Sequence, residues 1–303
     1  MAITAAMVKE LREITSAGMM DCKKALAETN GDMDAAIEFL RKKGMAGADK
    51  KAGRVAAEGV IAVAISADKK KAAIVEVNCE TDFVAKGDEF KAFADEIASI
   101  ALTLGTTDID AIMAATMASG KTVDERRREM IAKIGENMTM RRVEIIETSG
   151  AIGQYQHGEK IGVVVAMEGG NDGLIRDVAM HVAAVKPQAI STDDLDPSVV
   201  EKERVFQIEK AQEDNDKLPE EKRKPLDIIE KMIEGRMRKF AAEITLLEQE
   251  FVKDPSLKVK DLLKTNAATV HTFIRLEVGE GIEKLETNFA EEVAEAARAA
   301  KGV

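Results

Sequence analysis

The sequence is poor in aromatic residues and in cysteine. Its 303 residues include no tryptophan, one tyrosine and nine phenylalanines. Fifteen methionines are present instead, so we expect an aliphatic core in which flexible methionines fill the gaps. The two cysteines, Cys22 and Cys79, lie far apart in the chain. That spacing fits a reduced, cytoplasmic protein better than a disulfide scaffold.

Long apolar runs and strongly basic runs are also missing. No run reaches the roughly 18 apolar residues that a membrane span needs, and the N-terminus, MAITAAMVKELREI, is too charged for a signal peptide. The net charge is −11, without the concentrated Lys and Arg that would neutralise phosphates. We therefore expect no membrane association and no direct nucleic-acid partner. With 45% hydrophobic residues, the chain should fold into two or three globular domains.

Residues 1–44 are predicted to form three short helices. In the first helix apolar residues recur at helical spacing, and Asp21 is the predicted N-cap of the second. The third is expected to begin at Asp32 and to end at Gly44, followed by a small, polar linker over 44–56.

Three helices of this length enclose little core, so such a bundle usually works by offering a surface. The apolar pair Met19 and Met20 falls in the predicted loop between the first two helices and is the obvious candidate. The alternative is that both methionines fill the core of the bundle.

The middle of the chain contains two similar units. Residues 58–78 are predicted to form a β-hairpin followed by a helix over 88–104, and 149–170 a second hairpin followed by a helix over 171–187. The intervening residues 108–139 are predicted to be helical. The shared order indicates an internal duplication of a ββα unit.

The two units differ in the connection between strand and helix. The second unit uses GGNDG, which is ordinary turn chemistry, whereas the first has CETDFVAK with apolar Phe83 and Val84. Phe83 is therefore not required by the unit itself. It either offers a contact to another molecule or folds back against Phe90 or Val84.

Residues 192–240 have a different character. Two charged amphipathic helices flank a polar turn between Pro219 and Pro225, which predicts an antiparallel helical hairpin. Its charge indicates that it projects and pairs with another chain, although an ordinary helical domain remains the alternative. Residues 242–253 and 270–278 are predicted as strands that complete the second sheet, with a helix over 256–266 between them and a final helix over 280–301.

No catalytic arrangement is recognisable. The three histidines, His157, His181 and His271, lack the spacing of metal ligands, and neither cysteine belongs to a CxxC motif. The stretch ATMASGKT (115–122) ends like a phosphate-binding loop, but no strand precedes it and alanine replaces the first glycine. We predict no catalytic residue, no metal and no cofactor. The apolar pairs in exposed-looking positions instead suggest a binding protein with several contact modules.

Several stretches together resemble the bacterial elongation factor Ts family. They include VKELREITSAGMMDCKKALAETNGD, VNCETDFVAK, AKIGENM, QYQHGEKIGVVV, EGRMRKF and FIRLEVGEGIEK, in family order along the whole chain. The resemblance implies an α+β fold: a small ubiquitin-associated-like three-helix bundle, a core of two similar subdomains with antiparallel sheets, an inserted helical hairpin used for dimerisation, and a C-terminal helix. The implied boundaries are 1–54 for the bundle, 55–147 for subdomain N, 148–190 with 241–278 for subdomain C, 191–240 for the hairpin and 279–303 for the C-terminal module.

The resemblance also implies a function, which is guanine-nucleotide exchange on the GTPase elongation factor Tu without catalysis by this chain itself. It places Thr81, Asp82, Phe83 and Val84 in a loop that enters the GTPase domain of the partner and disturbs its magnesium site. The other implied partner-binding residues are Val8, Leu11, Met19, Met20, Ile134, Gly135 and His157. The hairpin tip is longer than in the best-known family members, which leaves self-association through 191–240 open.

Two other classes of function remain. A chaperone-like or adaptor protein would bind its partners through the bundle and the hairpin, so the bundle alone would suffice for the main partner. Nucleotide exchange would need residues 57–146 as well. An enzyme would need a polar site that the sequence does not contain.

Overall fold

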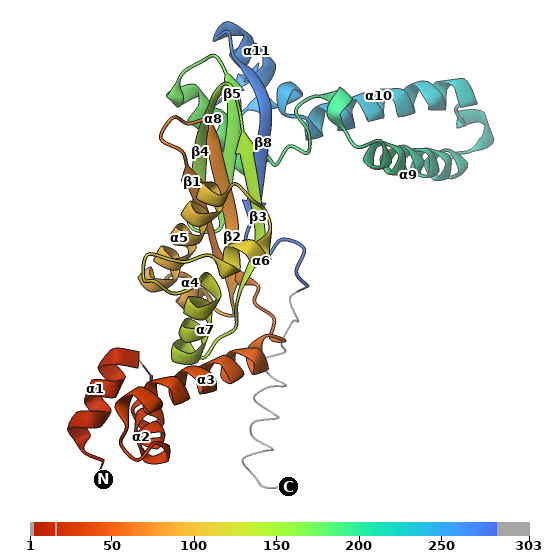
Figure 1. Cartoon of the computed structure of the whole chain (residues 1–303). Coiled ribbons are helices and arrows are strands. Elements are labelled where there is room, and N and C mark those ends of the chain that lie inside the picture. Colours follow the sequence, from red (N-terminus) through yellow and green to blue (C-terminus); the bar gives the residue numbers. More distant parts are fainter. Residues whose placement is uncertain (1–2, 16, 284–303) are drawn as a thin grey trace, which may run out of the picture.

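The computed structural model describes residues 3–15 and 17–283. It is a mixed helix-and-sheet protein with antiparallel sheets, as the sequence predicts. A helical bundle lies at the N-terminal end, two sheets pack together in the middle, and a helical hairpin projects from the side (Figure 1). Most of the helix predicted over 280–301 lies outside the described residues.

The bundle consists of α1 (Ala5–Thr15), α2 (Met19–Glu28) and α3 (Met33–Lys51). Its core is small and is formed by Leu11, Cys22, Ala25, Leu26, Ala36 and Leu40. The predicted start of the second helix is wrong. Gly18 is the N-cap, and Asp21 lies inside the first turn, where its negative charge interacts favourably with the helix dipole.

The prediction that the third helix ends at Gly44 before a linker is also wrong. α3 continues to Lys51 because it packs along α7 (Val123–Ile134) of the core. Arg41 pairs with Glu125, and Arg128 reaches Asp49 at 2.8 Å. Tertiary contact outweighs the low helix propensity of the glycines in this segment.

The first sheet has the order β1-β2-β3 and contains β1 (Glu58–Ile65), β2 (Lys71–Cys79) and β3 (Met138–Glu147). The predicted hairpin is confirmed as β1 and β2, and the predicted helix as α5 (Asp88–Leu104). Two shorter helices follow, α6 (Ile109–Ala114) and α7. The helical prediction for 108–139 fails in two places. Residues 115–122 form a non-helical connection between α6 and α7, and Gly135 adopts φ +95° and stops α7, after which the chain enters β3.

The second sheet has the order β4-β5-β8 and contains β4 (Ala151–His157), β5 (Ile161–Glu168) and β8 (Thr269–Glu277). The predicted hairpin and helix of this unit are confirmed as β4, β5 and α8 (Asp172–Val185). The predicted strand over 242–253 is wrong. Its first residues belong to α10 (Leu226–Ile244). Only Glu250–Phe251 form a strand, β6, which pairs with β7 (Asp254–Lys258) before α11 (Val259–Thr265).

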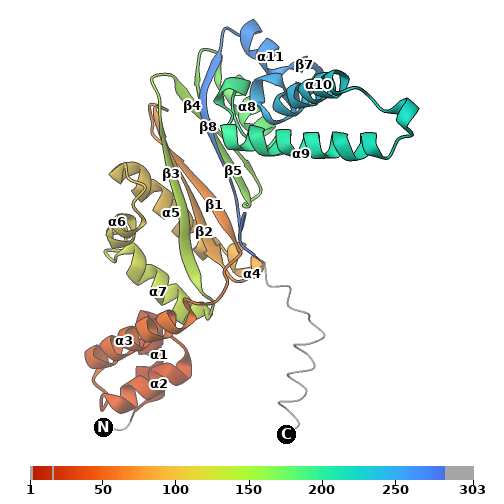
Figure 2. The same ribbon diagram turned by 90° about the vertical axis from the view of Figure 1, so that its right-hand side faces the viewer.

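The two sheets pack face to face, with α5 on one outer side and α8 on the other (Figure 2). The shared core between the sheets consists of Ile61, Ala72, Ile74, Ile146, Ile152, Val164, Ala166 and Leu276. Gly162 permits the close approach, since a Cβ there would lie 2.4 Å from Cγ2 of Ile61. The core therefore has four layers: α5, the first sheet, the second sheet and α8.

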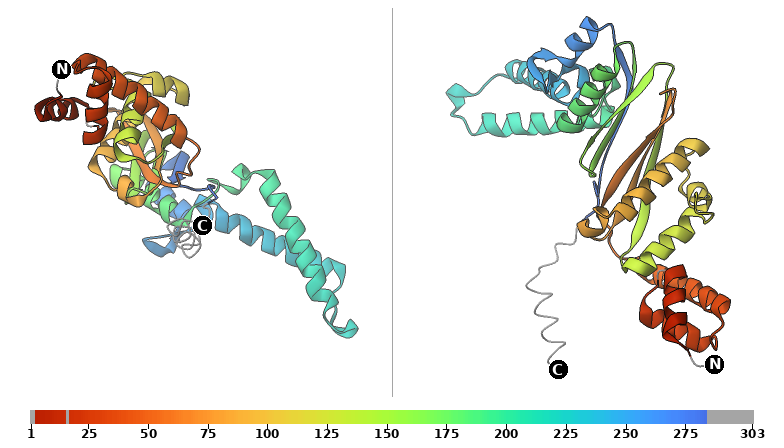
Figure 3. Two further views of the ribbon diagram at one scale, coloured as in Figure 1. Left: turned by 90° about the horizontal axis from the view of Figure 1, so that it is seen from below. Right: turned by 90° about the vertical axis from the view of Figure 1, so that its left-hand side faces the viewer.

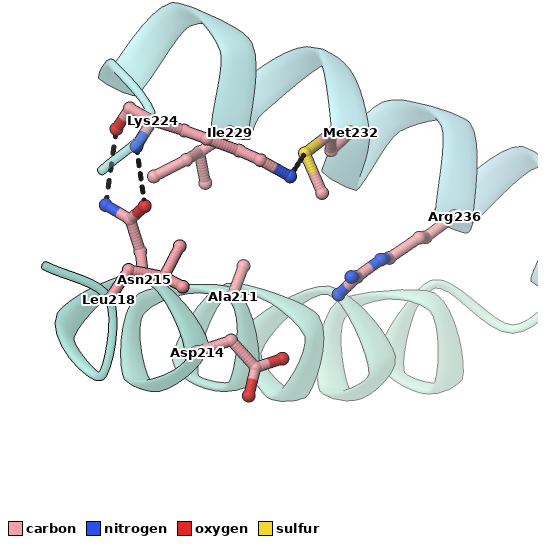
Figure 4. A pocket seen from close by; sticks show the side chains of 8 residues that line it. All are labelled: Ala211, Asp214, Asn215, Leu218, Lys224, Ile229, Met232 and Arg236. Atoms are coloured by element: carbon pink, nitrogen blue, oxygen red, sulfur yellow. Dashed lines mark hydrogen bonds between the residues drawn. The ribbon is translucent and has the colours of Figure 1, made fainter. Parts of the chain in front are cut away.

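The predicted antiparallel hairpin is formed by α9 (Pro197–Asp216) and α10 (Leu226–Ile244), which extend away from the sheets (Figure 3). A narrow apolar seam joins the helices and contains Ala211, Ile229, Ile233 and Met237. At the tip, Asn215 Oδ1 accepts the amide of Lys224 at 2.7 Å and its Nδ2 donates to the Lys224 carbonyl at 3.2 Å (Figure 4). These bonds close the tip over a hollow of about 120 Å³.

Candidate partner-binding site

Phe83 lies on a one-turn helix at the end of β2. This helix, α4 (Asp82–Ala85), is capped by Thr81, whose Oγ1 accepts the amide of Val84 at 3.4 Å. The side chain of Phe83 is 83% exposed, the most exposed large apolar side chain among the described residues. The alternative that it folds back against Phe90 or Val84 is therefore wrong. Val84 packs against the core instead, so the turn points one apolar side chain inward and one outward.

Asp82 is engaged within the same turn. Its carboxylate accepts a hydrogen bond from Lys86 at 2.6 Å, and this bond lowers the pKa of Asp82 and raises that of Lys86. Lys160, from the β4–β5 turn, adds a smaller electrostatic contribution that also lowers the pKa of Asp82. Asp82 is therefore ionised but partly neutralised in the free protein.

The loop between α7 and β3 lies against α4. Ile134 ends α7 and is 36% exposed, and the left-handed conformation of Gly135 turns the chain back toward β2. Glu136 then reaches Thr81. Its Oε2 accepts the Thr81 amide at 3.0 Å, and its Oε1 accepts the Thr81 hydroxyl at 2.7 Å. The structure thus brings together two of the sequence-predicted contact segments.

The β4–β5 turn lies at the same end of the molecule. His157 is exposed, with Nδ1 3.3 Å from the hydroxyl oxygen of Tyr155. The turn is attached to β1 and α5, because the Ile61 amide donates to the Glu159 carbonyl at 2.8 Å and Lys91 reaches the Glu159 carboxylate at 2.8 Å. Three predicted contact segments, Thr81–Val84, Ile134–Gly135 and His157, therefore share this end.

The bundle offers a separate surface. Met19 and Met20 lie in the first turn of α2 rather than in a loop, and they are 61% and 75% exposed. The alternative that they fill the core is wrong. Val8 is half-buried against the bundle core. Leu11 is fully buried there, so its predicted place among the partner-binding residues is corrected: it holds the bundle together and offers no surface.

The buried thiol of Cys79, next to the site, has a structural partner. The thiol of Cys79 donates to the Thr81 carbonyl at 3.2 Å, and burial, aided by the nearby charges of Glu136 and Glu58, raises its pKa to about 12. A thiol held neutral in this way is a poor nucleophile. Within residues 3–15 and 17–283, no group of three or more His, Cys, Asp or Glu side chains is arranged to hold a metal ion.

Comparison with known proteins decides the family. Residues 80–280 match the family described as elongation factor TS, a range that begins immediately before α4 and includes the α7–β3 loop, the β4–β5 turn and the hairpin. The chain belongs to the elongation factor Ts family. Members similar to it over the full length include elongation factor Ts of Hydrogenovibrio crunogenus, 71% identical over 302 residues and covering 100% of both chains.

Two further members of the elongation factor Ts family are also similar to the chain over nearly its full length. Those of Methylococcus capsulatus and Idiomarina loihiensis are each 53% identical to the chain. The alignments cover 99% and 100% of this chain, respectively, and 100% of each relative, so the family likeness includes the bundle as well. Among the described helices, none is long and apolar enough to cross a bilayer.

Three residues that hold the exposed turn were not predicted from the sequence. Glu136, Glu80 and Lys86 hold the exposed turn through hydrogen bonds. Because none of them is apolar, a pattern of exposed apolar residues does not include them. Two local signals were available. Lys86 follows Asp82 at the i, i+4 spacing of a helical ion pair, and Gly135 has the typical place of a helix stop.

Proposed function

We propose that this protein is a translation elongation factor that acts as a guanine-nucleotide exchange factor. In this proposal it binds elongation factor Tu with GDP in the cytoplasm, promotes GDP release and performs no catalysis of its own. The observation that carries the proposal is the 83% exposure of Phe83 at the apex of a capped, hydrogen-bonded turn. An aromatic side chain held outward in water is a typical anchor for another protein.

The mechanism rests on thermodynamic linkage. A GTPase holds GDP tightly because backbone amides of its phosphate-binding loop and a Mg²⁺ ion both contact the phosphates. A partner that binds the nucleotide-free form better must weaken GDP binding by the same factor. Phe83 would insert as a wedge between packed elements of the GTPase domain, and Asp82 would bring a negative charge close to the Mg²⁺ and phosphate groups.

The other exposed segments would add affinity around this centre. Ile134 and Gly135 lie beside α4 and extend the same contact, whereas Met19 and Met20 offer a second apolar patch on the bundle. His157 would contact another domain of the partner. Leu11 has no part in this surface, since it is buried.

The proposal is tested by the rate at which fluorescent GDP leaves elongation factor Tu. The wild-type protein should accelerate release, and Phe83→Ala should lose most of that acceleration while keeping its melting temperature. Leu104→Ala is a control, because Leu104 is also an exposed apolar residue, at 49%, but lies at the end of α5. No acceleration by the wild-type protein would exclude exchange activity.

An adaptor function is the second candidate, and the exposure of Met19 and Met20 favours it. An adaptor working through the bundle would lose its main partner with Met20→Asp and keep it with Phe83→Ala. An exchange factor would show the reverse order of effects on GDP release. Capture of the partner by the full chain and its two variants separates these possibilities.

We also propose that the hairpin allows two copies of the chain to associate. Val205, Phe206 and Leu226 keep exposed apolar surface on it, at 45%, 53% and 75%. Light scattering of the protein, alone and with Val205→Glu, tests this: a mass of one chain in the wild-type protein at working concentration would contradict it.

A further inference from the structure

Glu136 contacts the exposed turn through both oxygens of its carboxylate. The two hydrogen bonds, 3.0 Å to the amide and 2.7 Å to the hydroxyl of Thr81, join residues that are 55 positions apart in the chain. Bonds to a carboxylate are stronger than those between neutral groups. Glu136 is partly buried beneath α4, which limits competition from water.

The hydroxyl of Thr81 connects the Glu136 carboxylate to the helix turn that carries Phe83. A hydroxyl has one hydrogen to donate, and Glu136 accepts it. The lone pairs of Oγ1 are then directed toward the Val84 amide, which Oγ1 caps. Without Glu136 the hydroxyl could rotate and donate elsewhere, and a four-residue helix is too short to hold its shape without tertiary support.

A second carboxylate-to-backbone hydrogen bond joins the same two loops, with the carboxylate now supplied by the β2–α4 side. Glu80, next to Thr81, accepts the amide of Asn137, next to Glu136, at 2.6 Å. Arg54 lies over both loops, since its Nη1 is 3.4 Å from the Glu80 carboxylate and 3.5 Å from the Gly135 carbonyl. Each loop therefore supplies a carboxylate to the backbone of the other, so neither loop can shift alone.

We propose that Glu136 is a positioning residue for the insertion of Phe83 and that it couples the α7–β3 loop and α4 into one contact element. This inference rests on the proposed exchange function and deepens it. Glu136 itself need not touch the partner. Its role is to hold the Thr81–Val84 turn in the geometry that presents Phe83 outward, so that no binding energy is spent on ordering the turn.

The central experiment measures GDP release from elongation factor Tu over a range of concentrations of the full chain. Glu136→Ala and Thr81→Val should each lower the maximal release rate about tenfold or more, the effect expected from losing one or two charge-assisted hydrogen bonds. The half-saturating concentration should change less than threefold, because the other contact segments stay in place. Thr81→Ser keeps the hydroxyl and should retain most of the wild-type rate.

Two controls separate positioning from general loss of stability. Glu144→Ala removes an exposed glutamate from β3 and should leave both kinetic parameters unchanged. The double variant Thr81→Val with Glu136→Ala should be no slower than the slower single variant, because both remove the same connection. In hydrogen exchange, the Thr81 amide should lose protection in Glu136→Ala while amides of β2 stay protected.

The outcomes are distinguishable. If the wild-type protein does not accelerate GDP release, the exchange function fails and this inference fails with it. If the wild-type protein accelerates release and Glu136→Ala matches it, only the positioning role is overturned. It is likewise overturned if the Thr81 amide keeps its protection, or if the rates of the single variants fall only in proportion to their loss of folded protein.

Discussion

Gly44 of α3 lies against Ala132 of α7 so closely that a Cβ added to the glycine would sit 3.3 Å from the Cβ of Ala132. Few Cβ contacts are this short, and the absence of a side chain at Gly44 lets the two helices approach. The contact, with the ion pairs beside it, fixes the direction in which the bundle leaves the core. The surface of Met19 and Met20 is thereby held in a defined place relative to α4.

Gly44→Leu should separate α3 from α7 and broaden the range of bundle positions. Gly47→Leu is the matched control: it lies in the same helix, gains the same helix propensity, and has no atom within 4 Å of an added Cβ. Spin labels at Lys23→Cys and Ser99→Cys would report the distance between bundle and core. Equal distance distributions for the two glycine variants would show that Gly44 does not set the orientation.

Phe83→Ala should impair exchange more than Asp82→Asn does. Phe83 is 83% exposed among the described residues and so gives up little packing on binding, whereas Asp82 is already bonded to Lys86 at 2.6 Å. Truncating a central aromatic anchor typically costs about 2–4 kcal/mol, or roughly 30- to 1000-fold. Lys86→Gln leaves the charge of Asp82 unpaired and should not slow GDP release. A larger loss for Asp82→Asn than for Phe83→Ala, in release rates measured at saturation, would reverse this order.

Glu76 on β2 is fully buried and joins the two sheets. It pairs with Arg141 at 3.0 Å and Arg142 at 2.5 Å, and it accepts the amide of Gly279, just beyond β8, at 2.8 Å. Burial raises the pKa of Glu76, but the bonds from the Gly279 amide, Asn78 and Arg142 outweigh it, so the net shift is downward. The carboxylate is therefore ionised in the folded protein.

Glu76→Gln should lower the free energy of unfolding by about 3 kcal/mol, because it leaves two arginines without their buried counter-charge. Glu144→Gln, exposed on the neighbouring strand, should change it by less than about 0.5 kcal/mol. The depressed pKa sets the pH dependence: the contribution is present above the ordinary glutamate pKa of 4.5 and is lost as pH falls below it. Urea unfolding of both variants at neutral and acidic pH checks the two statements.

His181 is buried in α8 as a neutral ring. Its Nδ1 accepts the amide of Val252 at 3.2 Å, so the proton must lie on Nε2, which is 3.0 Å from Oε1 of Gln249. Burial lowers its pKa, and the Gln249 bond offsets this only in part. A second proton on Nδ1 would face the Val252 amide hydrogen.

The free energy of unfolding should therefore fall as pH drops below 6.5, the ordinary histidine pKa. Below that pH the His181 ring binds a proton in the unfolded chain and stays neutral in the folded chain. The slope should approach about 1.4 kcal/mol per pH unit. His181→Gln should remove this slope between pH 6.5 and 5.5, whereas His157→Gln, at an exposed position, should retain it. Identical slopes for both variants would exclude His181 as the source.

Removing the hairpin should leave the core folded. Its two ends are joined by hydrogen bonds from the Gln188 amide to the Ile244 carbonyl, 2.8 Å, and from the Leu246 amide to the Ala189 carbonyl, 2.9 Å. A Gly-Ser linker in place of residues 197–240 leaves these bonds intact, and closing such a loop costs little entropy. The shortened protein should melt within a few degrees of the full chain and scatter light as one copy. A large fall in the melting temperature of the shortened protein would show that the hairpin stabilises the sheets.

The sequence was sufficient where the side-chain pattern reflects local structure. Apolar runs on either side of a polar turn predicted both β-hairpins, and the helices over 88–104 and 171–187 were predicted from the sequence that follows each hairpin. It failed where tertiary contacts decide. Residues 44–51 contain two glycines and still form a helix, because α7 supports them. β3 was missed because the helical reading of α7 was carried past Gly135, although that glycine is a typical helix stop.

The sequence predicted the exposed residues of the candidate site but not the residues that hold them in place. Phe83, Met19 and Met20 are apolar residues in polar surroundings, and sequence alone suggests their exposure. Glu136 and Thr81 are separated by 55 positions, and a single sequence gives no sign of such a contact. The resemblance placed Leu11 among the partner-binding residues, but the structure buries it in the bundle core. A single sequence does not say whether the apolar face of a helix is covered by its own bundle or by a partner.

The hairpin and the Phe83 turn lie at different ends of the layered core (Figure 2). A GTPase bound at the turn therefore leaves the outer part of α9 and α10 accessible, and a second copy bound at the hairpin leaves the turn accessible. The two proposed associations therefore use separate surfaces of the chain. In that proposal the protein connects a GTPase at one end with a second copy of itself at the other, and its assemblies should grow by whole exchange-factor–GTPase pairs, with each pair as active as an isolated one.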